Sequence, residues 1–203
     1  MKKNSKEAII QAAISLFTAN GFDGTSIRDI ANKAKVNVAN ISYYFQSKQG
    51  LLEYCFTTFF EEYLLKIEKG YASLDHGASF CLKQMSSVII EFLCDNIQFT
   101  SFIFREMSID SQTVREIMTT YYRKEKYFLQ KVLEIGVESK EFRPQSISYI
   151  IVQLKGLWTM PFLNAPYLRE VLYLFPNERY FAAKYTLEIN KWIDEVLCVK
   201  KLA

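Results

Sequence analysis

Residues 21–52 read GFDGTSIRDIANKAKVNVANISYYFQSKQGLL, and this stretch decides the fold. Ser26 and Asp29 have the spacing of a capping box, in which each side chain binds the other residue's backbone N–H at the start of a helix. Asn37 is a favourable N-cap for a second short helix over residues 38–45. Two short helices joined by a tight turn predict a helix-turn-helix.

The expected helix over residues 38–45, VANISYYF, carries no charged side chain. Ile41 and Phe45 are four residues apart, so they share one face and are expected to be buried. The Asn, Ser and Tyr side chains of the helix are then left for its other sides. A helix of this kind beside a basic segment suits insertion into a groove of DNA.

Apolar residues recur at helical spacing along almost the whole chain. The expected helices cover residues 5–20, 25–34, 38–45, 48–70, 80–94, 97–107, 110–136, 145–160, 167–174 and 178–199. Seven glycines and four prolines are few for a loop-rich β fold, and no alternating run between turns is convincing as a strand. The 203-residue chain is therefore expected to be all-α.

The net charge of +3 is unevenly distributed along the chain. Residues 1–50 hold seven basic and three acidic side chains, a net charge of +4, whereas the rest holds 18 basic and 19 acidic ones, a net charge of −1. A basic cluster attracts phosphate groups. On charge alone, a solvated basic face is the simpler interpretation.

Other classes of function find little support in the sequence. The four cysteines are far apart and His76 is the single histidine, so we expect no metal site and no cofactor. The carboxylates form no catalytic constellation and the nucleophile-elbow and P-loop motifs are absent, so we expect no enzyme. No stretch approaches the roughly 18 uninterrupted apolar residues of a membrane span, so we expect a cytoplasmic protein without a membrane partner.

Residues 21–52 resemble the DNA-binding domain of TetR-family regulators. That family shows G-(F/Y)-x-x-T-(S/T)-(I/V)-x-x-I-A, then A-G-V-S, a recognition helix ending Y-x-x-F, and (S/N)-K-x-x-L-(L/F). The matching residues here are Gly21, Phe22, Thr25, Ser26, Ile27, Ile30, Ala31, Ala34, Val36, Phe45, Ser47, Lys48, Leu51 and Leu52. Two residues depart from the pattern: Lys35 replaces the usual turn glycine, and Ser42 replaces a common tyrosine.

The resemblance implies a TetR-like architecture and a DNA-binding homodimer. It predicts a three-helix helix-turn-helix domain over residues 1–47 and a larger helical dimerisation domain over residues 48–203. Each copy would place one recognition helix on half of a near-palindromic double-stranded DNA site, and the protein would be nucleoid-associated. The surplus of apolar residues on two late helices predicts a dimer interface at Ile147, Ile151, Leu154, Trp158, Tyr185, Ile189, Trp192 and Val196, although burial of both faces within the monomer would explain it too.

The candidate DNA-binding residues lie on the two short helices and at the start of the long helix that follows. They are Thr25, Ser26, Arg28, Asn37, Val38, Ala39, Asn40, Ser42, Tyr43, Tyr44 and Lys48. Asn40 can pair with adenine, and Val38 or Ala39 can pack on a thymine methyl group. Lys48, in the first turn of a helix, suits a phosphate. Helix capping alone also explains Ser26, and a salt bridge also explains Arg28.

The later segments leave two functions open. FREMSIDSQTVREIM, KEKYFLQ and QLKGLWTMPFLNAPYLREVLYLFP resemble a branch of the family that regulates the division Z ring and chromosome positioning during sporulation. That resemblance implies the cell-division protein FtsZ as a partner. The alternative is a ligand-responsive TetR-type repressor whose aromatic residues line an apolar pocket for a small-molecule effector, although the same residues suit ordinary core packing.

Overall fold

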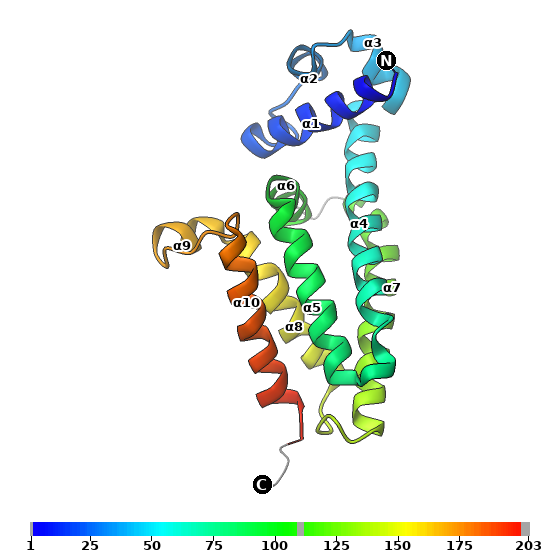
Figure 1. The fold of residues 1–203 in the computed structure, drawn as a ribbon. Coiled ribbons are helices and arrows are strands. Elements are labelled where there is room, and N and C mark those ends of the chain that lie inside the picture. Colours follow the sequence, from blue (N-terminus) through cyan, green and yellow to red (C-terminus); the bar gives the residue numbers. More distant parts are fainter. Residues whose placement is uncertain (1, 109–111, 200–203) are drawn as a thin grey trace. The chain divides into compact units, whose positions relative to one another are not determined.

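The computed structural model describes residues 2–108 and 112–199, and helices joined by loops make up this part (Figure 1). The helices are α1 (Lys2–Asn20), α2 (Ile27–Ala34), α3 (Val38–Phe45), α4 (Lys48–Tyr71), η1 (Leu74–His76), α5 (Ala78–Asp95), α6 (Ile97–Ser108), α7 (Gln112–Glu138), α8 (Ile147–Leu163), α9 (Ala165–Glu170), α10 (Arg179–Trp192) and η2 (Ile193–Leu197). The expectation of an all-α fold is confirmed.

The chain forms two compact units that do not follow the expected boundary at residue 47. The first comprises Met1–Glu61 and Gln98–Thr119, and the second comprises Glu62–Ile97 and Thr120–Ala203. The first unit thus contains the three N-terminal helices together with the start of α4 and most of α6. Whether residues 1–47 act as a separate DNA-binding domain stays a prediction.

The core of the first unit is aromatic. Phe17 of α1 stacks on Phe102 of α6 with ring centroids 5.2 Å apart, and Phe56 of α4 meets Phe102 edge-on at 6.3 Å. The apolar stripe expected on α1 is buried, with Ile9 and Phe17 fully enclosed. Burying such large side chains stabilises the N-terminal helices against one another.

In the second unit, α5 contacts η1, α8, α10 and η2 (Figure 1). The fully buried Trp158 of α8 donates its indole N–H to the Ser86 hydroxyl of α5 at 3.1 Å, which satisfies both polar groups inside the core. Gly70 of α4 lies against the backbone of Met85 of α5, so a side chain there would collide with the neighbouring helix. The α4–α5 crossing therefore depends on this glycine.

Three expectations about the late helices are corrected by the structure. Pro161 was expected to end its helix, but α8 continues to Leu163, with Pro161 inside its last turns. The short helix expected over residues 167–174 is α9, which ends at Glu170. The last helix changes to π geometry over Ile193–Leu197 instead of running unbroken to residue 199. The expected start of a long helix at residues 110–111 falls outside the described residues.

Within the described ranges, no helix alone is long and apolar enough to cross a membrane. Helices α5 and α6, which meet at a bend of 98°, reach the length and apolar composition of a membrane span only when they are counted together.

Candidate nucleic-acid interface

Both short helices begin with the caps that the sequence predicts. Ser26 accepts the Asp29 N–H at 3.2 Å, and the Asp29 carboxylate accepts the Ser26 N–H at 2.9 Å, which completes the capping box. Hydrogen bonds from the Ser26 hydroxyl and backbone lower the pKa of the Asp29 carboxyl. Asn37 caps α3 by accepting the Ala39 N–H at 2.8 Å. Ser26 and Asn37 thus fix where α2 and α3 begin.

The turn between the two helices carries an unusual backbone conformation. Lys35 is the C-cap of α2 and has φ 55° and ψ 44°, in the left-handed region. Its N–H bonds the Asn32 carbonyl, and the N–H of the following Val36 bonds the Ala31 carbonyl. Glycine adopts this conformation without steric cost, whereas Lys35 has a Cβ atom. Lys35 thus holds a left-handed conformation at the position where the sequence pattern usually has glycine.

One side of α3 is buried and the other is open to solvent. Ile41 and Phe45 are buried, as expected, and at about 100° per residue the opposite side is centred on Tyr43 and Ala39. Tyr43 exposes 72% of its surface. Asn40 borders this open side and is half-buried.

The other α3 candidates surround this open side. Val38 and Ser42 are exposed, whereas Tyr44 is half-buried and meets Tyr43 edge-on at 5.0 Å. Arg28 of α2 is exposed. Most of the candidate residues therefore have side chains that a duplex can reach.

Lys48, which the sequence assigns to a phosphate, also makes contacts within its own chain. Its ammonium donates to the Phe22 carbonyl at 2.9 Å and to the Thr25 carbonyl at 3.0 Å, and it lies 4.3 Å from the centre of the Phe22 ring. These contacts tie the α1–α2 loop to the start of α4. Two of the three ammonium donors are thus used within the chain.

Thr25 is not available to DNA, contrary to the sequence expectation. Its side chain is buried, and its hydroxyl donates to the Gly21 carbonyl at 2.8 Å and the Leu16 carbonyl at 3.3 Å. Threonine at this position therefore closes the loop after α1. A β-branched hydroxyl residue at a helix start looks the same in sequence whether it faces inward or outward.

Arg105 of α6 holds the end of α1 from another direction. Its guanidinium donates to the Thr18 carbonyl at 2.8 Å and also to the Phe17 carbonyl. The adjacent Glu106 is buried, and burial raises the pKa of its carboxyl despite the nearby Arg105 cation and the Phe22 N–H. A cation at a helix C-terminus satisfies orphan carbonyls and opposes the negative end of the helix dipole.

The sequence interpretation omitted three lysines of the first unit from the site. Lys33 and Lys35 are exposed around the α2–α3 turn and add positive charge beside α3. Lys6 of α1 lies 4.1 Å from the centre of the Tyr54 ring of α4, which is a stabilising cation–π contact. The charge count included all three lysines. Only the structure distinguishes Lys33 and Lys35, which are exposed, from Lys6, which packs on Tyr54.

Comparisons with known proteins agree with this geometry. Residues 9–55 match the model of the tetR family of bacterial regulatory proteins. Over 197 residues the chain is 42% identical to the probable HTH-type transcriptional regulator YttP of Bacillus subtilis (strain 168). The aligned region covers 97% of this chain and 95% of YttP.

The chain belongs to the tetR family of bacterial regulatory proteins. As a member of this family it is a DNA-binding transcriptional regulator.

Solved structures share the fold of this tetR-family chain. A regulatory protein of the family from Rhodococcus RHA1 superposes with a TM-score of 0.77 at 20% identity, covering 97% of this chain and 98% of that one. AibR, solved in complex with isovaleryl coenzyme A and operator DNA, superposes with a TM-score of 0.74 at 15% identity, covering 92% and 96%. At these identities the likeness concerns the fold alone.

The residues expected at a dimer interface of this tetR-family protein fall into two groups. Leu154, Trp158 and Ile189 are buried inside the monomer, so they pack its core and are withdrawn from the interface. The others are half-buried: Ile147, Ile151, Tyr185, Trp192 and Val196. The sequence showed more apolar positions than one face requires but did not indicate which of them point inward.

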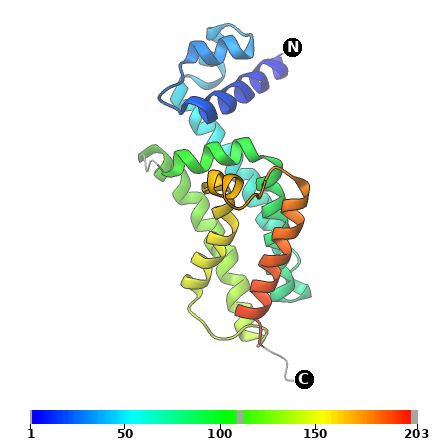
Figure 2. The same ribbon diagram turned by 90° about the vertical axis from the view of Figure 1, so that its left-hand side faces the viewer.

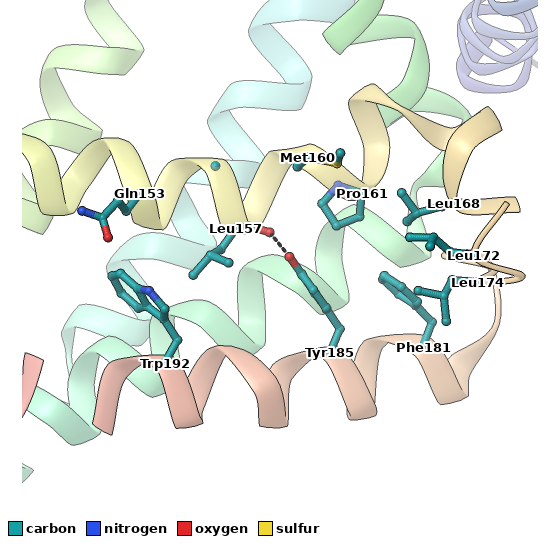
Figure 3. Close-up of a pocket in the computed structure, with 11 residues that line it drawn as sticks. Gln153, Leu157, Met160, Pro161, Leu168, Leu172, Leu174, Phe181, Tyr185 and Trp192 are labelled. Carbon is teal, nitrogen blue, oxygen red and sulfur yellow. Dashed lines mark hydrogen bonds between the residues drawn. The ribbon is translucent and has the colours of Figure 1, made fainter. Parts of the chain in front are cut away.

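Helices α8 and α10 lie side by side (Figure 2). Between them is an apolar groove of about 500 Å³ that is open to solvent. Figure 3 shows Leu157 and Pro161 of α8 opposite Tyr185 and Phe181 of α10. The Tyr185 hydroxyl donates to the Leu157 carbonyl at 2.7 Å and joins the two helices.

A buried polar cluster joins three helices of the second unit. Glu125 of α7 accepts hydrogen bonds from the Tyr63 hydroxyl of α4 and from the Lys155 ammonium of α8, both at 2.6 Å. Burial and the Glu125 carboxylate raise the pKa of Tyr63 well above its usual value. Glu125 and Tyr63 are almost fully buried, so these hydrogen bonds satisfy polar groups that have little access to water.

Proposed function

We propose that the protein is a homodimer that binds a near-palindromic double-stranded DNA site through the open side of α3. The observation that carries this proposal is that Ala39 and Tyr43 lie opposite the buried side of a helix whose start is fixed by Asn37. Asn40 borders this open side. The first residues of a recognition helix are those that meet base edges. The remaining candidates flank Ala39, Asn40 and Tyr43. They are Ser26, Arg28, Val38, Ser42 and Tyr44.

Within this proposal, Asn40 reads sequence and Lys48 positions the helix-turn-helix. An Asn side chain can donate to and accept from the major-groove edge of adenine. Lys48 instead holds the loop that leads into α2, because two of its donors are engaged by Phe22 and Thr25. Removal of the Lys48 ammonium should therefore disturb the fold of the helix-turn-helix more than it changes the number of phosphate contacts.

Fluorescence anisotropy titrations of the full chain against a selected duplex and a scrambled duplex test these roles. Asn40→Ala should reduce the ratio of the two affinities on the order of tenfold. Asn177→Ala, at an exposed position of the second unit, is the matched control and should leave the ratio unchanged. An unchanged ratio for Asn40→Ala would remove Asn40 from the readout.

Lys48→Met keeps the aliphatic stem and removes the ammonium. It should lower the melting temperature and the affinity for both duplexes while leaving the dependence of log Kd on log salt unchanged. A direct phosphate contact would instead reduce that slope by about one. A reduced slope without any loss of stability would contradict the positioning role.

The finer biological role that we propose resembles that of RefZ, a regulator of cell division and chromosome positioning during sporulation, with FtsZ as the partner and a nucleoid-associated location in the cytoplasm. The support is the resemblance of residues 104–118, 124–130 and 153–176. Genome-wide mapping of bound sites tests it. A few sites ordered by chromosome position are expected, whereas sites restricted to promoters would contradict this role.

A second candidate function is ligand-responsive repression. It is favoured by the likeness in fold to AibR, which was solved with isovaleryl coenzyme A, and by the open apolar groove between α8 and α10. An effector that binds the native state raises its melting temperature. A thermal-shift screen against acyl thioesters and other apolar metabolites separates the two candidates, since only the repressor should respond and then release DNA.

A further inference from the structure

The turn between α2 and α3 holds an exposed lysine in a backbone conformation that favours glycine. Lys35 has φ 55° and ψ 44°, and its side chain is open to solvent. A residue with a Cβ atom adopts this conformation at a cost to folding stability, whereas glycine adopts it freely. The turn is therefore less stable than glycine would make it, and it carries a positive charge in return.

No group of the described chain accounts for this charge. In the same unit, the ammonium groups of Lys48 and Lys6 are engaged by backbone carbonyls and by an aromatic ring. Over residues 2–108 and 112–199, no ion pair or side-chain hydrogen bond joins Lys35 to another residue. The negative end of the α2 dipole already has Lys33 in its last turn. The Lys35 ammonium is thus available to a partner outside the chain.

The position of Lys35 places this charge beside the start of α3. It precedes Val38, the first residue of α3, by three residues, so their Cα atoms are no more than about 11 Å apart. The major groove that a recognition helix enters is about 12 Å wide and is bordered by the phosphate backbone. When the first residues of α3 meet base edges, a lysine side chain just before them can reach a phosphate at the edge of the groove.

We propose that Lys35 is a phosphate contact in the α2–α3 turn, where the protein gives up folding stability for affinity for DNA. The inference rests on the binding mode proposed above, in which α3 enters the groove. A lysine binds phosphate as a flexible point charge, and phosphate contacts carry no sequence information directly. The Lys35 contact therefore strengthens binding to any duplex, in contrast to the sequence readout by Asn40.

Lys35→Gly should change stability and binding in opposite directions. Loss of the Cβ atom should raise the midpoint of urea denaturation. Loss of the ammonium should weaken binding to a selected duplex and to a scrambled duplex alike, on the order of fivefold at about 0.1 M salt, and should reduce the slope of log Kd against log salt by about one. Fluorescence anisotropy over a salt series and urea denaturation of the same full-length samples measure both effects.

Two further variants separate the charge from the backbone. Lys35→Met keeps the Cβ atom and the aliphatic stem, so it should lose the same affinity without the gain in stability. Lys140→Gly is the matched control, because Lys140 is an exposed lysine with φ 62° after the end of α7, in the second unit. Lys140→Gly should raise stability and leave the affinity and the salt slope unchanged.

The outcomes separate this inference from the proposed function. A wild-type protein that binds neither duplex would overturn the proposed function together with the Lys35 contact. Wild-type binding whose affinity and salt slope are the same in Lys35→Gly and Lys35→Met would overturn only the contact. An affinity loss that Lys35→Met does not share, or that Lys140→Gly does share, would also overturn it, because the change in backbone would then be the cause.

Discussion

Single residues of the first unit explain how the helix-turn-helix is held. Ser26 and Asn37 act locally, on backbone groups two or three positions away, and this is why the sequence alone predicted them. Thr25 and Lys48 act through contacts with the loop after α1, which no local pattern specifies. The sequence therefore indicated which residues belong to the motif, while the structure separates those that face outward from those that hold it together.

Lys35 provides a stability test of the turn. Because its φ of 55° is costly for a residue with a Cβ atom, Lys35→Gly should raise the free energy of unfolding by about 0.5–1 kcal/mol. Lys33→Gly, inside α2, is the control and should lower it by about 0.5–1 kcal/mol. Urea denaturation followed by circular dichroism measures both. A loss of stability in both variants would show that position 35 does not adopt the left-handed conformation.

Glu141 provides a test of pH dependence. Helix α5 has no side-chain cap of its own, and the Glu141 carboxylate accepts the N–H groups of Ala78 and Ser79, both at 3.0 Å. Burial alone would raise the pKa of this carboxyl, but the hydrogen bonds from Ser79, Ala78 and Ser139 lower it overall. The charged carboxylate therefore stabilises the folded state.

Glu141→Gln should lower the free energy of unfolding by about 1–3 kcal/mol at neutral pH. A lowered folded pKa gives stability that is complete above the unfolded pKa of about 4.3 and is lost as the pH falls through the folded value. The difference between wild type and variant should thus shrink below about pH 4. Urea titrations at a series of pH values measure it, with Glu138→Gln on the exposed end of α7 as control. If the difference in free energy of unfolding between wild type and Glu141→Gln did not change with pH, the charge of the Glu141 carboxylate would not be the source of the stabilisation.

At the scale of elements, the sequence predicted where helices lie better than what each face contacts. The boundaries of α3 agreed with the prediction because caps and breaks are local signals. Helix α8 is apolar on two faces, so periodicity did not reveal that Leu154 and Trp158 point inward while Val152 and Met160 are exposed. Pro161 was overestimated as a helix breaker, and the π turn after Trp192 has no sequence signal that we recognise.

The Tyr63–Glu125–Lys155 cluster connects α4, α7 and α8 and predicts strong coupling between these helices. Glu125→Leu should lower the free energy of unfolding by about 3 kcal/mol or more, because Lys155 and Tyr63 lose a buried partner. The double variant Glu125→Leu with Lys155→Met should recover most of this loss, since no unpaired charge remains. Chemical denaturation of the two single variants and the double variant measures the coupling. Simple additivity would contradict it.

At the scale of the whole molecule, the proposed function depends on two copies acting on one duplex. The motif in residues 21–52 sufficed to predict a DNA-binding regulator, and the family match agrees. The dimer face stays a prediction, because association between copies depends on which side chains remain exposed after folding, and three of the expected residues are buried within the monomer.

The most direct test of the central claim is selection of bound duplexes from a random-sequence library by the full-length protein. If α3 of each copy reads one half-site, the enriched sequences should contain two inverted half-sites whose centres lie about 10 bp apart or at a multiple of that spacing. Asn40→Ala should select a less constrained sequence at the same spacing. Enrichment of no sequence, or of a single asymmetric half-site, would contradict the account.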